Sequence, residues 1–128
     1  MKKTQKNCFV IMGYGIKYDY ASGRNLNLDK TYENIIQPVC KALQLNCVRA
    51  KDIAINGVID KPMYHRLYSA DVVIADISTL NANALYELGV RHAPRPYSTI
   101  VISEKELERP FDVNHTVINP YEHLGADI

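Results

Sequence analysis

The segment ADISTLNANALYELGVRHA (75–93) holds two carboxylates at a spacing that could serve catalysis. Asp76 ends an apolar run typical of a buried strand, and Glu87 lies in the middle of a helix predicted to begin near Ala82. Asn83 precedes Glu87 by four residues, so their side chains share a helix face. Further polar side chains follow Asp76 in the turn: Ser78, Thr79 and Asn81. The spacing predicts a crevice at a strand end, lined by two carboxylates and several amides.

Simpler interpretations of these residues remain open. Glu87 could be a solvated surface charge, and Asp76 could be an ordinary turn residue. Either Asn81 or Asn83 could serve only as the helix cap. The residue pattern alone therefore leaves both a catalytic and a purely structural interpretation.

The elements that must position these residues alternate between strands and helices. Short apolar runs predict strands, and apolar residues at helical spacing predict helices. In chain order they are strand 7–12, helix 30–43, strand 46–50, helix 59–70, strand 71–77, helix 82–92, strand 97–103 and a fifth strand at 115–119. This order predicts an α/β fold with a flavodoxin-like, doubly wound parallel sheet of about five strands, in a single domain over 1–128.

Details of these elements can be predicted as well. Asp29 is a candidate N-cap for the first helix, and Pro38 should kink or divide that helix. Asp60 is a candidate cap for the second helix. The strand DVVIADI should lie at the centre of the sheet, with Val72 and Ile74 fully buried.

In such folds ligands bind where the parallel strands end. Three loops leave these ends, at 13–29, 50–58 and 76–83. The first is long and polar, and we expect it to order over a ligand, with these candidate binding residues: Gly13, Tyr14, Gly15 and Arg24. A tyrosine could stack on a base and the arginine could contact a phosphate, although a solvated loop is an equal alternative. The GYG segment is not the GxGxxG fingerprint of dinucleotide-dependent redox enzymes.

Charge and composition exclude several classes of function. The formal net charge of +1 argues against binding to nucleic acid or to a membrane surface. No apolar run could span a bilayer or serve as a signal peptide, so we expect a cytoplasmic protein. The three cysteines are expected to be reduced and buried, and the four histidines fit no common zinc spacing, so we expect no metal.

Three segments, CFVIMGYG, VRAKDIAINGVID and ADISTLNANALYELGVRHA, resemble the nucleoside 2-deoxyribosyltransferase-like and TIR-like superfamily over residues 7–103. The resemblance implies that Glu87 works at the anomeric carbon of a nucleoside or nucleotide. It also adds Asp52 to the candidate binding residues, because Arg49 and Asp52 match the superfamily's segment after the second strand. Those two residues could instead pair with each other. The remaining candidates for substrate binding are Asp76, Ser78, Asn81 and Asn83.

The leaving group separates two reactions that this resemblance implies. Glycosidases use one carboxylate at the anomeric carbon and a second as an acid. Deoxyribosyltransferases generally carry that acid six residues before the nucleophile, where this chain has Asn81, although Asp76 could substitute. Nicotinamide leaves NAD as a neutral molecule, so one carboxylate can be enough. The resemblance therefore favours NAD glycohydrolase chemistry, with NAD as the substrate and no bound cofactor.

The resemblance also bears on partners and organisation. The ending FDVNHTVINPYEHLG (111–125) resembles the join to a helical-repeat region in bacterial proteins organised like the apoptosis-signal-regulating kinases. Residues 104–128 could thus lead into a following region, and a homo-oligomer with a signalling or defence role is expected. Two rivals stay open: nucleoside deoxyribosyl transfer or nucleotide hydrolysis in the same pocket, and a non-catalytic module that senses a nucleotide or oligomerises.

Overall fold

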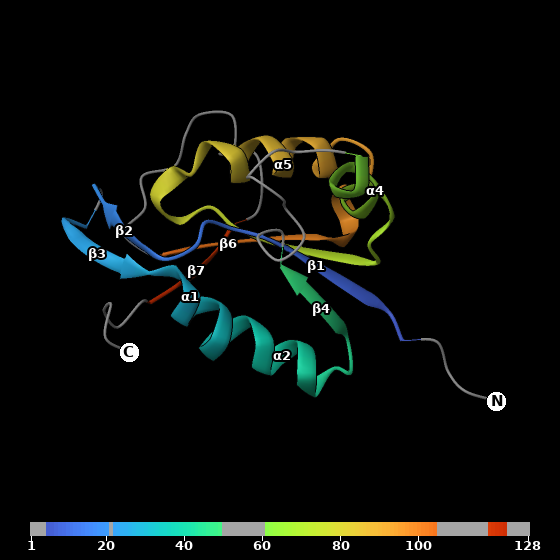
Figure 1. Ribbon diagram of the computed structural model, residues 1–128, viewed down its shortest axis with the longest axis horizontal. Coiled ribbons are helices and arrows are strands. Elements are labelled where there is room, and N and C mark those ends of the chain that lie inside the picture. Colours follow the sequence, from blue (N-terminus) through green and yellow to red (C-terminus); the bar gives the residue numbers. More distant parts are fainter. Residues whose placement is uncertain (1–4, 21, 50–60, 105–117, 123–128) are drawn as a thin grey trace.

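A parallel sheet of five strands forms the middle layer of the protein (Figure 1). The computed structural model describes residues 5–20, 22–49, 61–104 and 118–122. The strands of the sheet are β1 (Asn7–Ile11), β4 (Asn46–Arg49), β5 (Val72–Asp76), β6 (Thr99–Glu104) and β7 (Ile118–Tyr121). They lie in the order β4-β1-β5-β6-β7, and each neighbouring pair is parallel. This is the flavodoxin-like order, which confirms the predicted fold class and the central place of DVVIADI.

Helices lie on both sides of this sheet (Figure 1). One side carries α4 (Lys61–Ser69) and α5 (Ala82–His92). The other side carries one longer helical segment, in which α1 (Leu28–Thr31) continues through a π-helical turn (Tyr32–Ile36) into α2 (Gln37–Ala42). We call these the α4–α5 face and the α1–α2 face of the sheet.

The core divides into two apolar clusters, one on each face. Phe9 and Ile11 of β1 pack with residues of α4 and α5, whereas Cys8 and Val10 pack with residues of α1 and α2. Side chains alternate between the two faces along a strand, so β1 is buried on both sides. The apolar run NCFVIM reflects this double burial.

For the first helix, the predicted N-cap at Asp29 was wrong, and the predicted division near Pro38 is confirmed. It begins at Leu28, and Asp29 does not cap it, because the Asp29 carboxylate accepts hydrogen bonds from Arg49 and from the Gly15 amide instead. The expected division of the helix takes the form of the π-helical turn, which ends directly before the turn that contains Pro38. Proline has no N–H for a regular helical bond and its ring crowds the preceding turn, so a widened turn there relieves both conflicts.

The predicted loop 13–29 is largely a β-hairpin, so that prediction was wrong in part. Strands β2 (Ile16–Asp19) and β3 (Arg24–Asn27) pair antiparallel as a separate two-stranded sheet. Gly23 has a φ of +72°, which the turn between them requires and which glycine adopts without strain. Leu26 is fully buried in the α1–α2 cluster, which anchors the hairpin to the core.

The burial predicted for β5 was also wrong at two positions. Val73 and Ala75 are fully buried beneath α4 and α5, but Val72 and Ile74 are only half-buried at the margin of the α1–α2 cluster. The α1–α2 segment packs against β4 and against Cys8 and Val10 of β1, and leaves this side of β5 only partly covered. The apolar sequence of β5 predicts a central strand, but it does not predict how completely helices cover each of its faces.

The remaining boundaries agree closely with the sequence. Helix α5 spans the predicted residues. The ends of the five strands of the sheet differ from the predicted ends by at most three residues. A short 3₁₀ turn (Pro96–Ser98) precedes β6, and the proposed cap Asp60 lies outside the described residues. Within the described ranges, no helix has the length and apolar character needed to cross a membrane.

Candidate functional site

The turn between β5 and α5 brings the candidate site together. It is a 3₁₀ turn (Ser78–Leu80) in which Thr79 and Leu80 have φ values of 63° and 53°. Residues other than glycine adopt this left-handed conformation at a cost, and such strain is concentrated at functional sites. Asn81 then caps α5, because its side-chain oxygen accepts a hydrogen bond of 3.0 Å from the Ala84 amide. Asn81 is therefore the cap, and Asn83 is exposed.

Glu87 lies on the buried side of α5. The buried residues of this helix are Ala84, Glu87, Leu88 and Arg91, and Glu87 itself is only 7% exposed. Asn83 precedes Glu87 by one helical turn but lies on the surface. The interpretation of Glu87 as a solvated surface charge is therefore wrong.

The carboxyl group of Glu87 lacks compensation for its burial. Its Oε2 atom has no hydrogen-bond partner among the residues that the structure describes. Burial raises the pKa of Glu87 to about 7, because the charged form loses its hydration. A buried, unpaired carboxyl group is costly to keep, which makes it a candidate for a functional role.

Asp76 has the opposite surroundings. Its Oδ1 atom accepts hydrogen bonds from the Ser78 amide at 3.0 Å and the Ser78 hydroxyl at 2.7 Å. Its Oδ2 atom accepts one of 2.8 Å from the hydroxyl of Tyr121. Burial, together with the negative charge of Asp76, raises the pKa of the Tyr121 hydroxyl well above its usual range. Ser78 Oγ also accepts a hydrogen bond from the Glu104 amide at 2.8 Å, so this network joins the ends of β5, β6 and β7.

The two carboxylates do not lie on the same side of the sheet. Ile74 belongs to the α1–α2 cluster, and Asp76 follows it by two residues, so the Asp76 side chain is directed to the α1–α2 face. Glu87 belongs to α5 on the α4–α5 face. The described geometry therefore does not unite Asp76 and Glu87 in one crevice.

Gly13 lies beside Asn81, as a shared site would need. A Cβ atom on Gly13 would lie 2.9 Å from Leu28 Cδ1, so the leucine side chain would have to shift, and it would lie 3.6 Å from Asn81 Nδ2, which is ordinary contact. Strand β2 also contacts the turn that precedes Asn81. The first and third predicted loops, 13–29 and 76–83, thus meet at the carboxyl end of the sheet.

The other candidates from the first loop have varied roles. Tyr14 is half-exposed, with the Lys17 ammonium 5.6 Å from its ring centroid. Gly15 has a φ of +72° and donates its amide hydrogen to Asp29. Arg24 Nη2 lies 3.2 Å from Oε1 of the buried Glu104, so contact with a phosphate would compete with this ion pair.

Arg49 has a partner that the sequence did not suggest. Its Nη1 atom donates a hydrogen bond of 2.8 Å to Asp29 Oδ1, and its guanidinium lies 4.4 Å from the centroid of the Tyr32 ring. The alternative partner considered for Arg49 was Asp52, which lies outside the described residues. Asp52 lies only three residues from Arg49 in sequence, which made it an obvious candidate partner. Asp29 lies 20 residues from Arg49 and comes near it only in the folded chain.

Arg91, one turn after Glu87, is fully buried and was not predicted as important. Its guanidinium donates hydrogen bonds to the carbonyl oxygens of Leu67 and Ala70, at 3.1 and 2.8 Å. It also donates to the hydroxyls of Ser98 and Thr99, at 2.8 and 3.1 Å. Burial lowers the pKa of this guanidinium. Arg91 therefore joins α4, α5 and β6, and its donors are directed away from Glu87.

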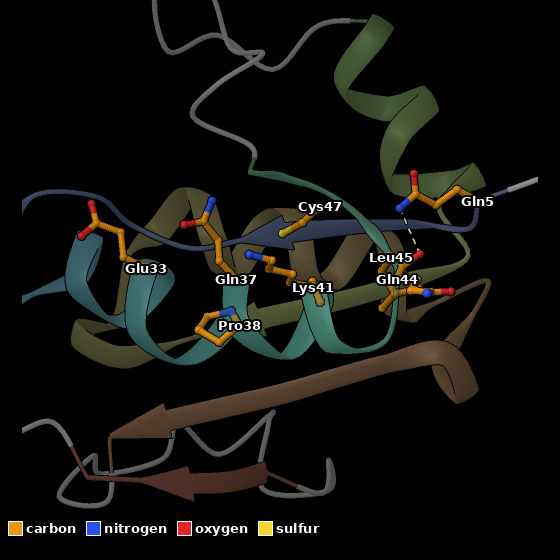
Figure 2. Close-up of a pocket in the computed structure, with 9 residues that line it drawn as sticks. Gln5, Glu33, Gln37, Pro38, Lys41, Gln44, Leu45 and Cys47 are labelled. Carbon is orange, nitrogen blue, oxygen red and sulfur yellow. Dashed lines mark hydrogen bonds between the residues drawn. The ribbon is translucent and has the colours of Figure 1, made fainter.

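A surface groove lies elsewhere, along α2 and β4 (Figure 2). Its lining includes Glu33, Gln37, Lys41 and Cys47, and none of the predicted site residues. In the part of the chain that the structure describes, no group of three or more histidine, cysteine, aspartate or glutamate side chains is gathered that could hold a metal ion.

In comparisons with known proteins, no family model matches this chain, and neither does any curated protein or any solved structure. The superfamily resemblance therefore stays a prediction from the sequence motifs, and function must be argued from the geometry of the chain itself.

Proposed function

We propose that this protein cleaves the N-glycosidic bond of NAD, with the carboxylate of Glu87 acting at the anomeric carbon. One observation carries the proposal: Glu87 is 7% exposed, and its Oε2 atom has no hydrogen-bond partner in the described part of the chain. A carboxylate removed from water and from other donors interacts strongly with a positive charge that develops beside it. A ribosyl group that loses its base develops such a charge at its anomeric carbon.

The proposed reaction needs no second carboxylate. The bond between the anomeric carbon and the nicotinamide nitrogen breaks, and its electron pair passes to the cationic ring, which leaves as neutral nicotinamide. Glu87 stabilises the resulting positive charge on the ribose or bonds to it. Water then adds to the anomeric carbon and releases one proton, which yields ADP-ribose.

The surroundings of Asn81 and Asp76 favour NAD over an ordinary nucleoside. An ordinary nucleobase leaves well only when an acid protonates it. Asn81 is an amide whose oxygen already caps α5, and it has no proton of that kind to give. Asp76 accepts hydrogen bonds on both oxygens and is directed to the other face of the sheet, so it is poorly placed to serve as that acid.

The raised pKa of Glu87 gives the reaction a characteristic pH dependence. Only the ionised carboxylate can stabilise a cation, and burial raises its pKa to about 7. We therefore expect kcat/KM to rise with pH and to level off above about 7.

The test is incubation of the purified protein with NAD and with a panel of nucleosides, followed by chromatography of the products. Glu87→Gln should keep the fold and reduce turnover at least about 100-fold, which corresponds to about 3 kcal/mol. Glu33→Gln is the matched control, because it makes the same change on an exposed helical position and should leave turnover unchanged. Equal turnover in wild type and Glu87→Gln would show that the assignment is wrong. Binding without cleavage at any protein concentration would favour a sensing module instead.

A further inference from the structure

The helical segment from α1 to α2 presents two very different flanks beside its buried side. Tyr32, Ile36 and Cys40 point into the core. Each residue of a helix is rotated by about 100° from the one before it, so the residues just after these three form one flank and those just before form the other. The flank after them carries Glu33, Gln37 and Lys41, which line the groove beside β4 (Figure 2).

The opposite flank is apolar and exposed. Ile35 and Val39, which precede Ile36 and Cys40, are 36% and 48% exposed, and Leu43, four residues after Val39 at the C-cap of α2, is 65% exposed. Thr31, which precedes Tyr32, is buried and is not part of this surface. Because the polar flank faces β4, this apolar flank faces the other way, toward β5 and β6. No charged residue occurs between Glu33 and Lys41, which is unusual for the outer surface of a helix.

The strands beside this flank are also incompletely covered. Ile102 and Ile74 lie half-buried at the margin of the α1–α2 cluster. Ile100 shares the face of Ile102 by strand alternation and is 45% exposed. We call the combined surface the open face; it consists of Ile35, Val39, Leu43, Val72, Ile74, Ile100 and Ile102. It forms an apolar helical ridge beside an apolar strand floor.

We infer that a second copy of this chain covers the open face, in a two-fold dimer whose α1–α2 segments pack antiparallel. In this arrangement Val39 lies near the two-fold axis, and Ile35 of each copy packs against Leu43 of the other. Each helical segment also lies over the strand floor of the other copy. Pro38 and Ala42, which are exposed and carry little bulk, allow close approach there.

The charge pattern and the symmetry of a two-fold contact favour a second copy of the chain as the occupant. A two-fold contact places the same surface of each copy against the other, so a charged residue at its centre would face an identical charge and be repelled. The stretch from Asn34 to Cys40 carries none, which removes this penalty. Since ridge and floor lie side by side on one face, the two-fold arrangement buries both in each copy. Charge-poor, apolar centres of this kind are typical of homodimer interfaces.

The dimer leaves the candidate site accessible. Glu87 belongs to α5 on the α4–α5 face, whereas the open face lies on the α1–α2 face. Association and cleavage of NAD can therefore be measured independently, and failure of one proposal does not decide the other.

Sedimentation of the whole chain and of charge variants tests the dimer. Wild type should be a dimer at about 100 µM, and Ile35→Lys or Leu43→Asp should raise Kd at least about 100-fold. The double variant, Ile35→Lys with Leu43→Asp, should associate again, because the introduced lysine of one copy meets the introduced aspartate of the other. This rescue separates a lost interface from a lost fold. Tyr68→Asp is the control, because Tyr68 is 66% exposed on α4 and lies outside the interface.

Three results would overturn the inference. These are a monomeric wild type at that concentration, a Tyr68→Asp variant that dissociates as readily as the open-face variants, and a double variant that stays as weakly associated as the single ones. A monomer whose open-face variants remain folded would indicate that a different partner covers this surface.

Discussion

Asp76 ends β5 and Glu87 lies in the following helix α5, yet the surroundings of these two buried carboxyl groups differ completely. Asp76 is 2% exposed and accepts hydrogen bonds from Ser78 and Tyr121 on both oxygens. Glu87 is 7% exposed, and its Oε2 has no partner within the described ranges. Burial alone therefore does not distinguish a carboxylate with satisfied oxygens from one with an unsatisfied oxygen. The supply of donors does, because a satisfied carboxylate stabilises the fold and an unsatisfied one stays available for a ligand.

Removal of Asp76 should give the largest loss of stability. Asp76→Ala leaves the Ser78 amide, the Ser78 hydroxyl and the Tyr121 hydroxyl without their acceptor in a buried place. We expect the free energy of unfolding to fall by about 4 kcal/mol. Urea unfolding at neutral pH measures it. A loss as small as that of an exposed variant such as Glu33→Ala would show that the hydrogen bonds of Asp76 contribute little to stability.

The pH dependence of stability should set Glu87 apart. The pKa of Glu87 is raised from 4.5 to about 7 in the fold, so the folded state keeps a proton that the unfolded chain has already lost. Wild-type stability from this group is complete below about 4.5 and is lost as pH rises through about 7. Glu87→Gln lacks this loss, so its stability relative to wild type should increase across that window by on the order of 3 kcal/mol.

The measurement is urea unfolding of both proteins at several pH values between these limits. A constant difference between wild type and Glu87→Gln would mean that the carboxyl group titrates normally. A difference that shrank with rising pH would indicate an unrecognised donor that stabilises the charged form, which is the situation of Asp76.

The smallest effect should come from a single donor of the Asp76 network. Tyr121→Phe removes the hydrogen bond of 2.8 Å to Asp76 Oδ2 and the one of 2.9 Å between the Tyr121 and Ser78 hydroxyls, but leaves both bonds from Ser78 to Asp76. We expect a loss of about 1 kcal/mol in the free energy of unfolding. Combined with Asp76→Ala, it should cost less than it does alone, since the bond between Tyr121 and Asp76 is then already absent and only the one to Ser78 remains. Full additivity in this double-mutant cycle would mean that the two groups do not interact.

The sequence predicted the fold well where apolar periodicity is strong. Helix α5 and strand β5 lie where their patterns placed them. The hairpin was missed because IKYD and RNLN are short and polar, and only Leu26 in them is a buried apolar residue. The exposure of Ile74 could not be foreseen either, because it depends on which elements cover the strand rather than on the strand itself.

The candidate site was predictable only in part. Local spacing placed Glu87 on a helix, and the asparagine pattern offered Asn81 or Asn83 as the cap, of which the structure shows Asn81. Which side of the helix Glu87 occupies depended on the packing of α5 against the sheet. The role of Asp76 depended on Tyr121, which is 45 residues away in sequence and reaches it only through the pairing of β6 with β7. Contacts at such separations leave no trace in a local pattern.

The way α5 is held at both ends has a consequence for the entropy of any reaction at Glu87. Asn81 fixes the first turn of the helix, and Arg91 fixes the last turn through its bonds to α4 and to the start of β6. The backbone of Glu87 lies between these two attachments and has little freedom to move. Much of the conformational entropy that must be lost to orient its carboxyl group is therefore lost when the chain folds. Little further entropy would have to be lost when a transition state binds.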